Sequence, residues 1–344
     1  MSNLPSSVAL TLWAPNLLEP SRVHAAKEAL KQRKLPALNI LLARAGRHYH
    51  QSRAFEAQAC YLFHQPQPLP SAPLLAAALL PDSFSQDSNA FWIAVNPVQM
   101  LPDRDTLLLF PPEELAIREP ESLALLQAFN QHFAQDKIAL LYAQPEQWFM
   151  QIAQPIDLQS TPLNQVAYQA VTHAYPRGNA APYWRKLLNE SQMLFYRHPV
   201  NEQRRQLAQP EINSIWPWGE GRLASAQIHL RSQARIYSDN PYLQGLAKVT
   251  SAQAFARLSR FAEWYQPAGH SLIHLAESKS LELETWLVSL EQFEKDWAQP
   301  LLEALSAGQI DSVLLDLGAS HSYYLTKAKL KRFWRWSRHW SKCV

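Results

Sequence analysis

Glycine is the residue that most limits what this chain can build. The sequence contains only 8 glycines among 344 residues, where ordinary usage of about 7% would give roughly 24. A loop that wraps a phosphate needs glycines because its backbone must approach the ligand closely. Neither G-x-G-x-x-G nor G-x-x-x-x-G-K-S/T occurs in the chain. The sequence therefore argues against nucleotide binding of the Rossmann or Walker type.

The overall composition is that of a globular chain. Hydrophobic residues make up 47% of the sequence and charged residues 18%, and the length suffices for one large domain or two ordinary ones. No run approaches the ~18 uncharged apolar residues of a membrane-spanning helix, and Pro15 and Glu19 interrupt the early apolar segment. Cys60 and Cys343 suit neither a disulfide framework nor a zinc site, so we expect a reduced, cytoplasmic compartment.

Acidic residues are sparse in the first quarter of the chain. Residues 1–81 contain no aspartate, and Asp82 is the first. Hard cations prefer oxygen anions, and enzymes that place a metal at the tip of their first strand usually take a carboxylate from this segment. The histidines at positions 48, 50 and 64 fall in expected helices without acidic neighbours. The residues therefore predict no metal site and no cofactor.

Hydrophobic periodicity predicts an α/β chain. Residues 8–13 (VALTLW) form a short apolar run that predicts a buried strand. Residues 90–153 predict two strands, a helix at about 112–133 and two further strands, which is a compact β-β-α-β-β unit. The other expected helices lie near 21–32, 37–46, 53–64, 163–174, 182–197, 251–263 and 284–305, and the other expected strands near 226–237, 271–276 and 312–317.

The densest cluster of polar residues lies between residues 189 and 222. It combines imidazole, amide and guanidinium groups with two tryptophans and two of the eight glycines. Such a Trp-walled set of donors suits a small anionic ligand. The alternative is structural, with Asn201 capping a helix, Asn213 satisfying a turn and the tryptophans in the core. The candidate ligand-binding residues are His198, Asn201, Arg204, Asn213, Trp216, Trp218 and Arg222, with Arg104 joining from a second segment.

That second segment, residues 96–105, carries two carboxylates. Asp103 and Asp105 flank Arg104 between two expected strands. A paired-carboxylate site would need one raised pKa and a partner within reach. The other interpretation is a hairpin corner held by its charges.

Both segments resemble a known family. The matching motifs are W-x-x-x-N-P-V-x-M-x-x-D-R-D at 92–105, W-x-x-L-L-N-E-x-Q-M-L at 184–194, H-P-V-N-x-x-R at 198–204 and I-N-S-I-W-P-W-G-E-G-R-L at 212–223. They resemble the bacterial RpfE-type regulatory proteins. The last two are similar, more distantly, to archaeal-type cofactor-independent phosphoglycerate mutases of the alkaline-phosphatase-like superfamily.

The resemblance implies a fold and a division of the chain. The expected fold is an α/β phosphatase- or mutase-like sheet with helices on both faces and an inserted β-β-α-β-β plus helical subdomain. The body would comprise residues 1–87 and 223–325, the insertion 88–222 and a basic tail helix 326–344.

The resemblance also implies where this chain departs from the enzymes. The mutases carry an Asp-Gly metal site after the first strand, a phosphorylated serine and late Asp-His pairs. Here that strand ends in Trp13-Ala14-Pro15-Asn16, without a carboxylate. Without metal-binding carboxylates, two-metal phosphoryl transfer lacks its main source of charge stabilisation. We therefore expect a non-catalytic regulatory or binding protein with a pocket for a small anionic ligand such as a phosphorylated one, with no catalytic residue and with a protein as a further partner.

Two alternatives stay open. A metal-dependent phosphomutase or phosphohydrolase with rearranged ligands would draw on Asp103, Asp105, Asp316 and His321, and it requires these side chains to converge. An interaction protein would use its tail, since residues 327–344 hold seven basic residues and no acidic one. An amphipathic helix there would direct Lys331, Arg332, Arg335 and Arg338 toward a membrane or nucleic acid, or would pack its aromatic face on the body.

Overall fold

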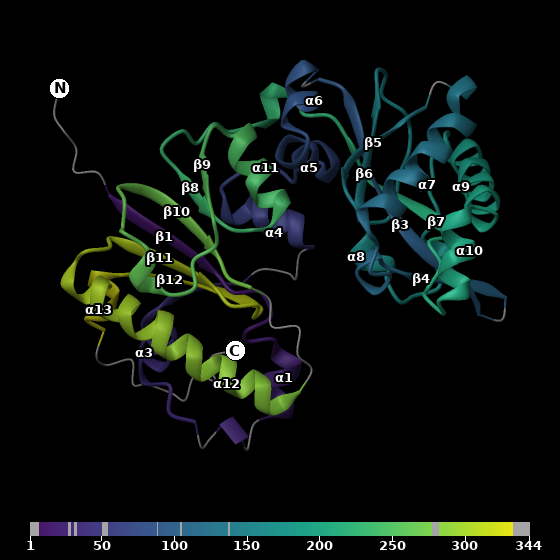
Figure 1. The fold of residues 1–344 in the computed structure, drawn as a ribbon. Helices are drawn as coiled ribbons and strands as arrows, with labels where there is room; N and C mark the ends of the chain where they lie inside the picture. Colours follow the sequence, from purple (N-terminus) through teal and green to yellow (C-terminus); the bar gives the residue numbers. More distant parts are fainter. Residues whose placement is uncertain are drawn as a thin grey trace. The chain divides into compact units, whose positions relative to one another are not determined.

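The chain forms two compact units. The computed structural model describes residues 7–26, 29–30, 33–49, 54–87, 89–103, 105–136, 138–276 and 282–332. The first unit comprises Met1–Gln67 and His229–Val344, and the second comprises Pro68–Ile228 (Figure 1). The second unit is thus an insertion into the first. It begins earlier than the expected start at residue 88, because helix α5 (Ser71–Leu79) packs on two strands of the second unit.

A seven-stranded sheet forms the centre of the first unit. Five strands run parallel, and β12 and β2 continue the sheet in antiparallel pairing at one edge. All five parallel strands therefore end at the same edge. The order is β2 (Gly46–Tyr49), β12 (His321–Thr326), β11 (Ser312–Asp316), β1 (Val8–Trp13), β10 (Gly269–His274), β8 (Arg235–Tyr237) and β9 (Gln253–Phe255).

The two faces of this sheet carry different chemistry, because successive side chains of a strand point to opposite faces. Leu10, Leu12 and Ile273 belong to an apolar core that also contains residues of α1 (Pro20–Ala25), α3 (Pro36–Arg44), α12 (Leu283–Phe293) and α13 (Gln299–Ala307). The alternate positions hold polar and aromatic groups, and α4 (Phe55–Leu62) and α11 (Pro241–Val249) contribute their neighbours. We call this second side the polar face. Its members include Thr11, Trp13, His270, His274, Ser312, Asp316 and Ser322.

Several expected elements are confirmed and others are wrong. The strands expected at 8–13 and 312–317 are β1 and β11. The helix expected near 251–263 is wrong: Ser251 adopts a left-handed backbone (φ 59°) after α11, and the chain then pairs as edge strand β9 before a short 3-10 turn at Phe261–Glu263. His48 lies in β2 rather than in a helix. Of the strand expected at 226–237, only β8 forms, after a 3-10 turn at Ser225–Gln227.

The second unit is built around one long strand. β3 (Phe91–Asp103) pairs with β4 (Thr106–Phe110), β6 (Gln147–Ile152) and β7 (Ser214–Gly221), and β5 (Leu140–Gln144) pairs with β6, always antiparallel. Helix α7 (Glu119–His132) lies between the two strand pairs, so the expected β-β-α-β-β unit is confirmed. The remaining helices are α6 (Pro81–Gln86), α8 (Leu163–Val166), α9 (Ala181–Tyr196) and α10 (Pro199–Gln206), with 3-10 turns at Pro112–Glu114, Ala134–Asp136 and Val171–His173.

The chain leaves the first unit after Gln67 and returns to it at His229. Inside each unit, close contacts hold the outgoing and the returning segments together. Within the first unit, the Gln65 amide bonds to both backbone groups of His229, at 3.1 and 3.0 Å. Within the second, a Cβ on Gly219 would lie 2.9 Å from Ser71 Cβ, and one on Gly221 would lie 2.5 Å from Pro70 Cβ. The glycine pair thus lets β7 approach the start of α5.

No helix in the described ranges is long and apolar enough to cross a membrane.

Helix α3 receives its N-terminal cap from a distant part of the first unit. Leu35, at the N-cap, supplies no side-chain hydrogen bond. Glu294 instead accepts from the backbone N–H groups of Ala37 (2.6 Å) and Leu38 (2.9 Å). Glu294 begins a π-helical turn, Glu294–Ala298, between α12 and α13. A wider turn of this kind places one residue off the regular helical pattern.

We expect Glu294→Ala to destabilise the first unit. Removal of the carboxylate leaves two buried N–H donors without an acceptor, at a cost of about 1–3 kcal/mol each. Urea unfolding followed by circular dichroism measures the change. Glu291→Ala is the control, since the Glu291–Arg33 ion pair is exposed to solvent and should contribute little to stability. Equal losses in the two variants would contradict the capping role.

Candidate functional site

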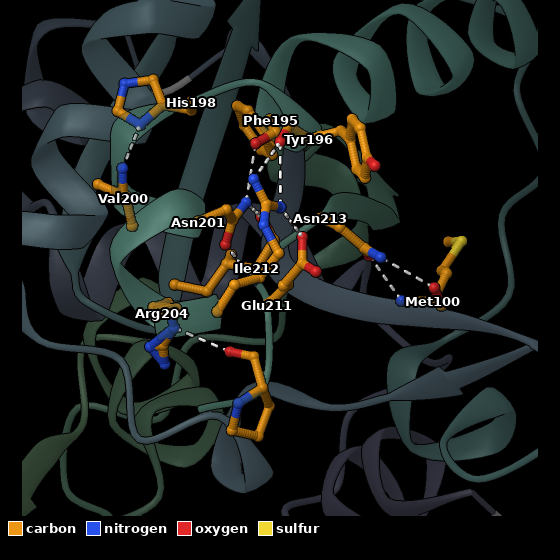
Figure 2. Close-up of polar contacts among 12 residues, drawn as sticks. Met100, Phe195, Tyr196, His198, Val200, Asn201, Arg204, Glu211, Ile212 and Asn213 are labelled. Carbon is orange, nitrogen blue, oxygen red and sulfur yellow. Dashed lines mark hydrogen bonds and ion pairs between the residues drawn. The ribbon is translucent and has the colours of Figure 1, made fainter. Parts of the chain in front are cut away.

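Two asparagines of the predicted cluster imitate backbone pairing in the second unit. Asn201, fully buried on α10, donates to the carbonyls of Phe195 and Ile212 and accepts from the Ile212 N–H, all within 2.9 Å (Figure 2). Asn213 forms a similar pair of bonds with both backbone groups of Met100, at 2.8 and 2.9 Å. Each side-chain amide thus uses both its N–H donor and its oxygen acceptor in hydrogen bonds to the backbone.

Arg204 is the centre of a buried charge network. Its guanidinium, 1% exposed, donates to the carbonyls of Pro210 (2.8 Å) and Leu115 and pairs with Glu121 at 3.5 Å. Burial alone would raise the pKa of Glu121, but hydrogen bonds and charges from Arg118 and Arg204 bring it below its ordinary value. Because this pKa is lower in the folded chain, the network stabilises the fold above pH ~4.3 and loses that contribution as the pH falls through the folded pKa.

The other predicted candidates lie along β7 and at the start of α10. The indole N–H of Trp216 donates to the Thr161 carbonyl (2.8 Å), and that of Trp218 donates to Asn96 Oδ1 (2.6 Å). His198 is the N-cap of α10, and its Nδ1 accepts from the Val200 N–H at 3.2 Å. Burial lowers the pKa of His198 despite the nearby Glu202.

The structure brings only part of the predicted set together. Asn201 and Arg204 meet the segment at 210–213, while Arg222 is exposed beyond the end of β7. Arg104 lies outside the described residues. Ligand binding by this set stays a prediction, and the contacts observed for its buried members hold the second unit together.

The residues predicted for the two alternative functions lie in different parts of the chain. Asp103 and Asp105 are exposed at the β3–β4 turn of the second unit, whereas Asp316 and His321 belong to the first. Asp316 is 2% exposed and accepts a hydrogen bond from Gln58 Nε2 of α4. In the tail, α14 (Lys327–Leu330), Lys331 and Arg332 are described, whereas Arg335 and Arg338 lie outside the described residues.

Aromatic rings fill the tip of β1 in the first unit. Trp13 stacks on Phe55 with 4.9 Å between ring centroids, and the His274 ring lies 4.8 Å from Trp13. His274 Nδ1 is 3.0 Å from Ser238 Oγ, and its buried Nε2 has no hydrogen-bond partner among the described residues. Burial, and next the charge of Arg257, lower the pKa of His274 to about 4. The imidazole is therefore neutral at physiological pH.

A cavity of about 440 Å³ is lined by residues that follow β1, β9 and β10 and by residues of α12 and the π-helical turn. Its charged side chains are Arg257 and Asp296. Arg257 Nε pairs with Asp239 at 3.5 Å, and its two Nη groups make no hydrogen bond or ion pair with the described residues. The full lining is Ala14, Pro15, Leu17, Arg257, Leu258, Ser259, Leu275, Ala276, Ser289, Gln292, Phe293, Asp296 and Trp297. We call it the strand-end cavity.

Sequence reasoning missed this site. Ser238, Arg257 and His274 follow or end three different strands, and none stands in a cluster along the chain. A signal was available in GHSLIH at 269–274, where His270 and His274 alternate with apolar residues and so share one face of a strand.

Among the described residues, no group of three or more His, Cys, Asp or Glu side chains is arranged to hold a metal ion.

Comparison with known proteins identifies the fold. No family model matches the chain, and no curated protein matches its sequence. Two solved structures are similar over 93% of the chain. One is a cofactor-independent phosphoglycerate mutase from Thermoplasma acidophilum (TM-score 0.50, 12% identity, 90% of that chain covered). The other is a protein from Pyrococcus horikoshii (TM-score 0.59, 11% identity, 86% covered).

The chain therefore has an α/β fold like that of the phosphoglycerate mutases, as the resemblance implied. At this identity the likeness concerns the fold alone, and membership of the RpfE-type family stays a prediction.

We expect Arg204→Met to destabilise the second unit by about 1–3 kcal/mol for each of the two carbonyls, of Pro210 and Leu115, that it leaves without a donor. Glu121 keeps its contact with Arg118 but loses the second guanidinium. Urea unfolding measures the loss. Arg205→Met is the matched control: the neighbouring Arg205–Glu211 pair is more exposed and should contribute about 1 kcal/mol or less. If both variants unfolded alike, the Arg204 guanidinium would not be structural.

Proposed function

We propose that this chain is a binding protein built on the phosphoglycerate mutase-like fold. In this proposal it holds a small anionic ligand in the strand-end cavity and does not turn it over. The observation that carries the proposal is a cavity at the carboxyl ends of parallel strands that is lined by a guanidinium whose Nη donors have no partner among the described residues.

The position and size of the cavity support ligand binding. Open α/β sheets bind their ligands outside the carboxyl ends of the strands, and β1, β9 and β10 all end at this cavity. Its volume of about 440 Å³ falls within the ~300–1,000 Å³ that is usual for small-molecule sites.

The lining indicates the chemistry of the ligand. Most of the wall is apolar, including Leu258, Phe293 and Trp297, while the donors of Arg257 Nη1 and Nη2 are unused. A compact molecule with one anionic group would pair that group with the guanidinium. Ser259, Ser289 and Gln292 add polar contacts for hydroxyl groups.

The tip of β1 supports binding without turnover. The resemblance places a metal-binding carboxylate there in the mutases, and this chain has Trp13 instead, whose ring stacks on Phe55 and contacts the tilted ring of His274. Asp316, a carboxylate at a neighbouring strand end, is engaged by Gln58. Aromatic rings cannot replace the carboxylates that two-metal phosphoryl transfer requires.

We expect 3-phosphoglycerate, used as a probe, to bind the chain in titration calorimetry. Arg257→Met should weaken this binding by about tenfold or more, because a hydrogen-bonded charge pair is lost. Arg260→Met, three residues away and paired with Glu263, is the matched control and should bind like the original chain. The absence of binding, or equal affinities in the two variants, would contradict the proposed site.

We also expect no conversion of 3-phosphoglycerate to its 2-isomer when Mg²⁺ or Mn²⁺ is supplied. ³¹P NMR distinguishes the two isomers and free phosphate. Turnover that disappears in Asp316→Asn would instead establish the phosphomutase alternative.

A further inference from the structure

A second cavity, of about 230 Å³, lies on the polar face of the first unit near the amino ends of β1, β10 and β11. Its lining is rich in imidazole and hydroxyl groups and contains no carboxylate. The lining residues are Ala9, Leu10, Thr11, His48, Tyr61, His64, His270, Ser312, Leu314 and Tyr324. We call it the histidine cavity. It shares no residue with the strand-end cavity.

A directed chain of hydrogen bonds ends in this cavity. Arg231 Nη2 lies 3.1 Å from His270 Nδ1. A guanidinium can only donate, so Nδ1 accepts and the ring proton sits on Nε2. Nε2, 2.9 Å from Thr11 Oγ1, therefore donates to Thr11. The neutral ring that this requires agrees with the pKa of His270, which burial, Arg231 and His64 lower to about 3.

The last donor of this hydrogen-bond chain, the Thr11 hydroxyl, has no acceptor among the described residues. Its oxygen already accepts from His270, and Thr11 makes no other hydrogen bond with the described residues. The side chain is 2% exposed and lines the cavity. A buried O–H without an acceptor is costly, and an electronegative atom in the cavity would remove that cost.

The charge of the surroundings favours an anion. Arg231 lies over the Phe63 ring, 5.4 Å from its centroid, and forms no ion pair with a described carboxylate. His64 lies 5.2 Å from His270, measured between ring centroids. A half-buried cation without a counter-charge is unfavourable, so a bound anion would stabilise Arg231 and satisfy Thr11 together.

We propose that the histidine cavity binds a small inorganic oxyanion, sulfate or phosphate, through Thr11, His64 and the Arg231–His270 pair. A volume of about 230 Å³ is below the ~300 Å³ at which sites for larger organic ligands begin. Tetrahedral oxyanions accept from several donors at once, which matches a ring of hydroxyl and imidazole groups. This site is separate from the proposed function and does not depend on it.

Binding of sulfate should tighten as the pH falls from 8 to 6. Burial and Arg231 lower the pKa of His64, and a bound anion favours the charged ring, so its pKa rises on binding. Sulfate does not titrate in this range, whereas phosphate does, so sulfate reports the protein alone. The titratable groups that line the cavity are His48, Tyr61, His64, His270 and Tyr324. Arg231 contacts His270, and Lys329 lies over the Tyr324 ring.

Titration calorimetry of the full chain with sodium sulfate, at ionic strength held constant with chloride, tests the proposal. We expect saturable one-to-one binding that Thr11→Val weakens by roughly 10- to 100-fold, since a hydrogen bond to a charged ligand is lost. His64→Gln should remove most of the pH dependence. His173→Gln, exposed in the second unit, should change neither result.

Arg257→Met separates this proposal from the proposed function, because it should leave sulfate binding unchanged. If Thr11→Val fails to fold by circular dichroism, His64→Gln and Arg231→Met decide. Absence of saturable binding would overturn the proposal, and so would unchanged binding in the cavity variants.

Discussion

The alternation of side chains across the seven-stranded sheet governs the rest of the first unit. One face buries leucine, isoleucine and valine against α3, α12 and α13, while the other buries hydroxyl, imidazole and carboxyl groups. Burial of a polar group without a partner costs roughly 1–3 kcal/mol. The polar face therefore depends on specific pairs: Thr11 with His270, Ser238 with His274, and Gln58 with Asp316. The histidine cavity is lined by residues of this face, including Thr11, His270 and Ser312.

In the second unit, the amides of two asparagines and one guanidinium supply hydrogen bonds to buried backbone groups. Asn201 supplies main-chain-like bonds to Ile212, just before β7, and Asn213 supplies them to Met100 of β3. Arg204 serves two carbonyls and the buried Glu121. These side chains stand close together in the sequence because they connect α10, the segment that precedes β7, and β3. Their order along the chain is the same in a structural cluster and in a ligand-binding motif, so the sequence alone does not separate the two roles.

The sequence pattern predicted the elements that carry their own signal. β1, β11 and the β-β-α-β-β unit are apolar runs between clear breaks, and they form as predicted. β9, β12 and β2 do not carry such a signal, because their strand state comes from pairing with neighbours distant in sequence. The strand-end cavity could not be predicted for a related reason. Ala14, Arg257 and Leu275, which follow three different strands, line the same cavity only because of the strand order of the sheet, which no single segment encodes.

The neighbouring ends of residues 68–228 bear on how this segment could be gained or lost during evolution. In the first unit, the hydrogen bonds between Gln65 and His229 hold the outgoing and returning segments together. In the second unit, Pro70 and Ser71 lie close to Gly221 and Gly219 and do the same. A segment whose two ends are neighbours can be added to, exchanged on or removed from a host domain without opening the host. Residues 68–228 thus form an inserted unit whose ends are neighbours. Gly219 and Gly221, two of the chain's eight glycines, allow the close approach of those ends.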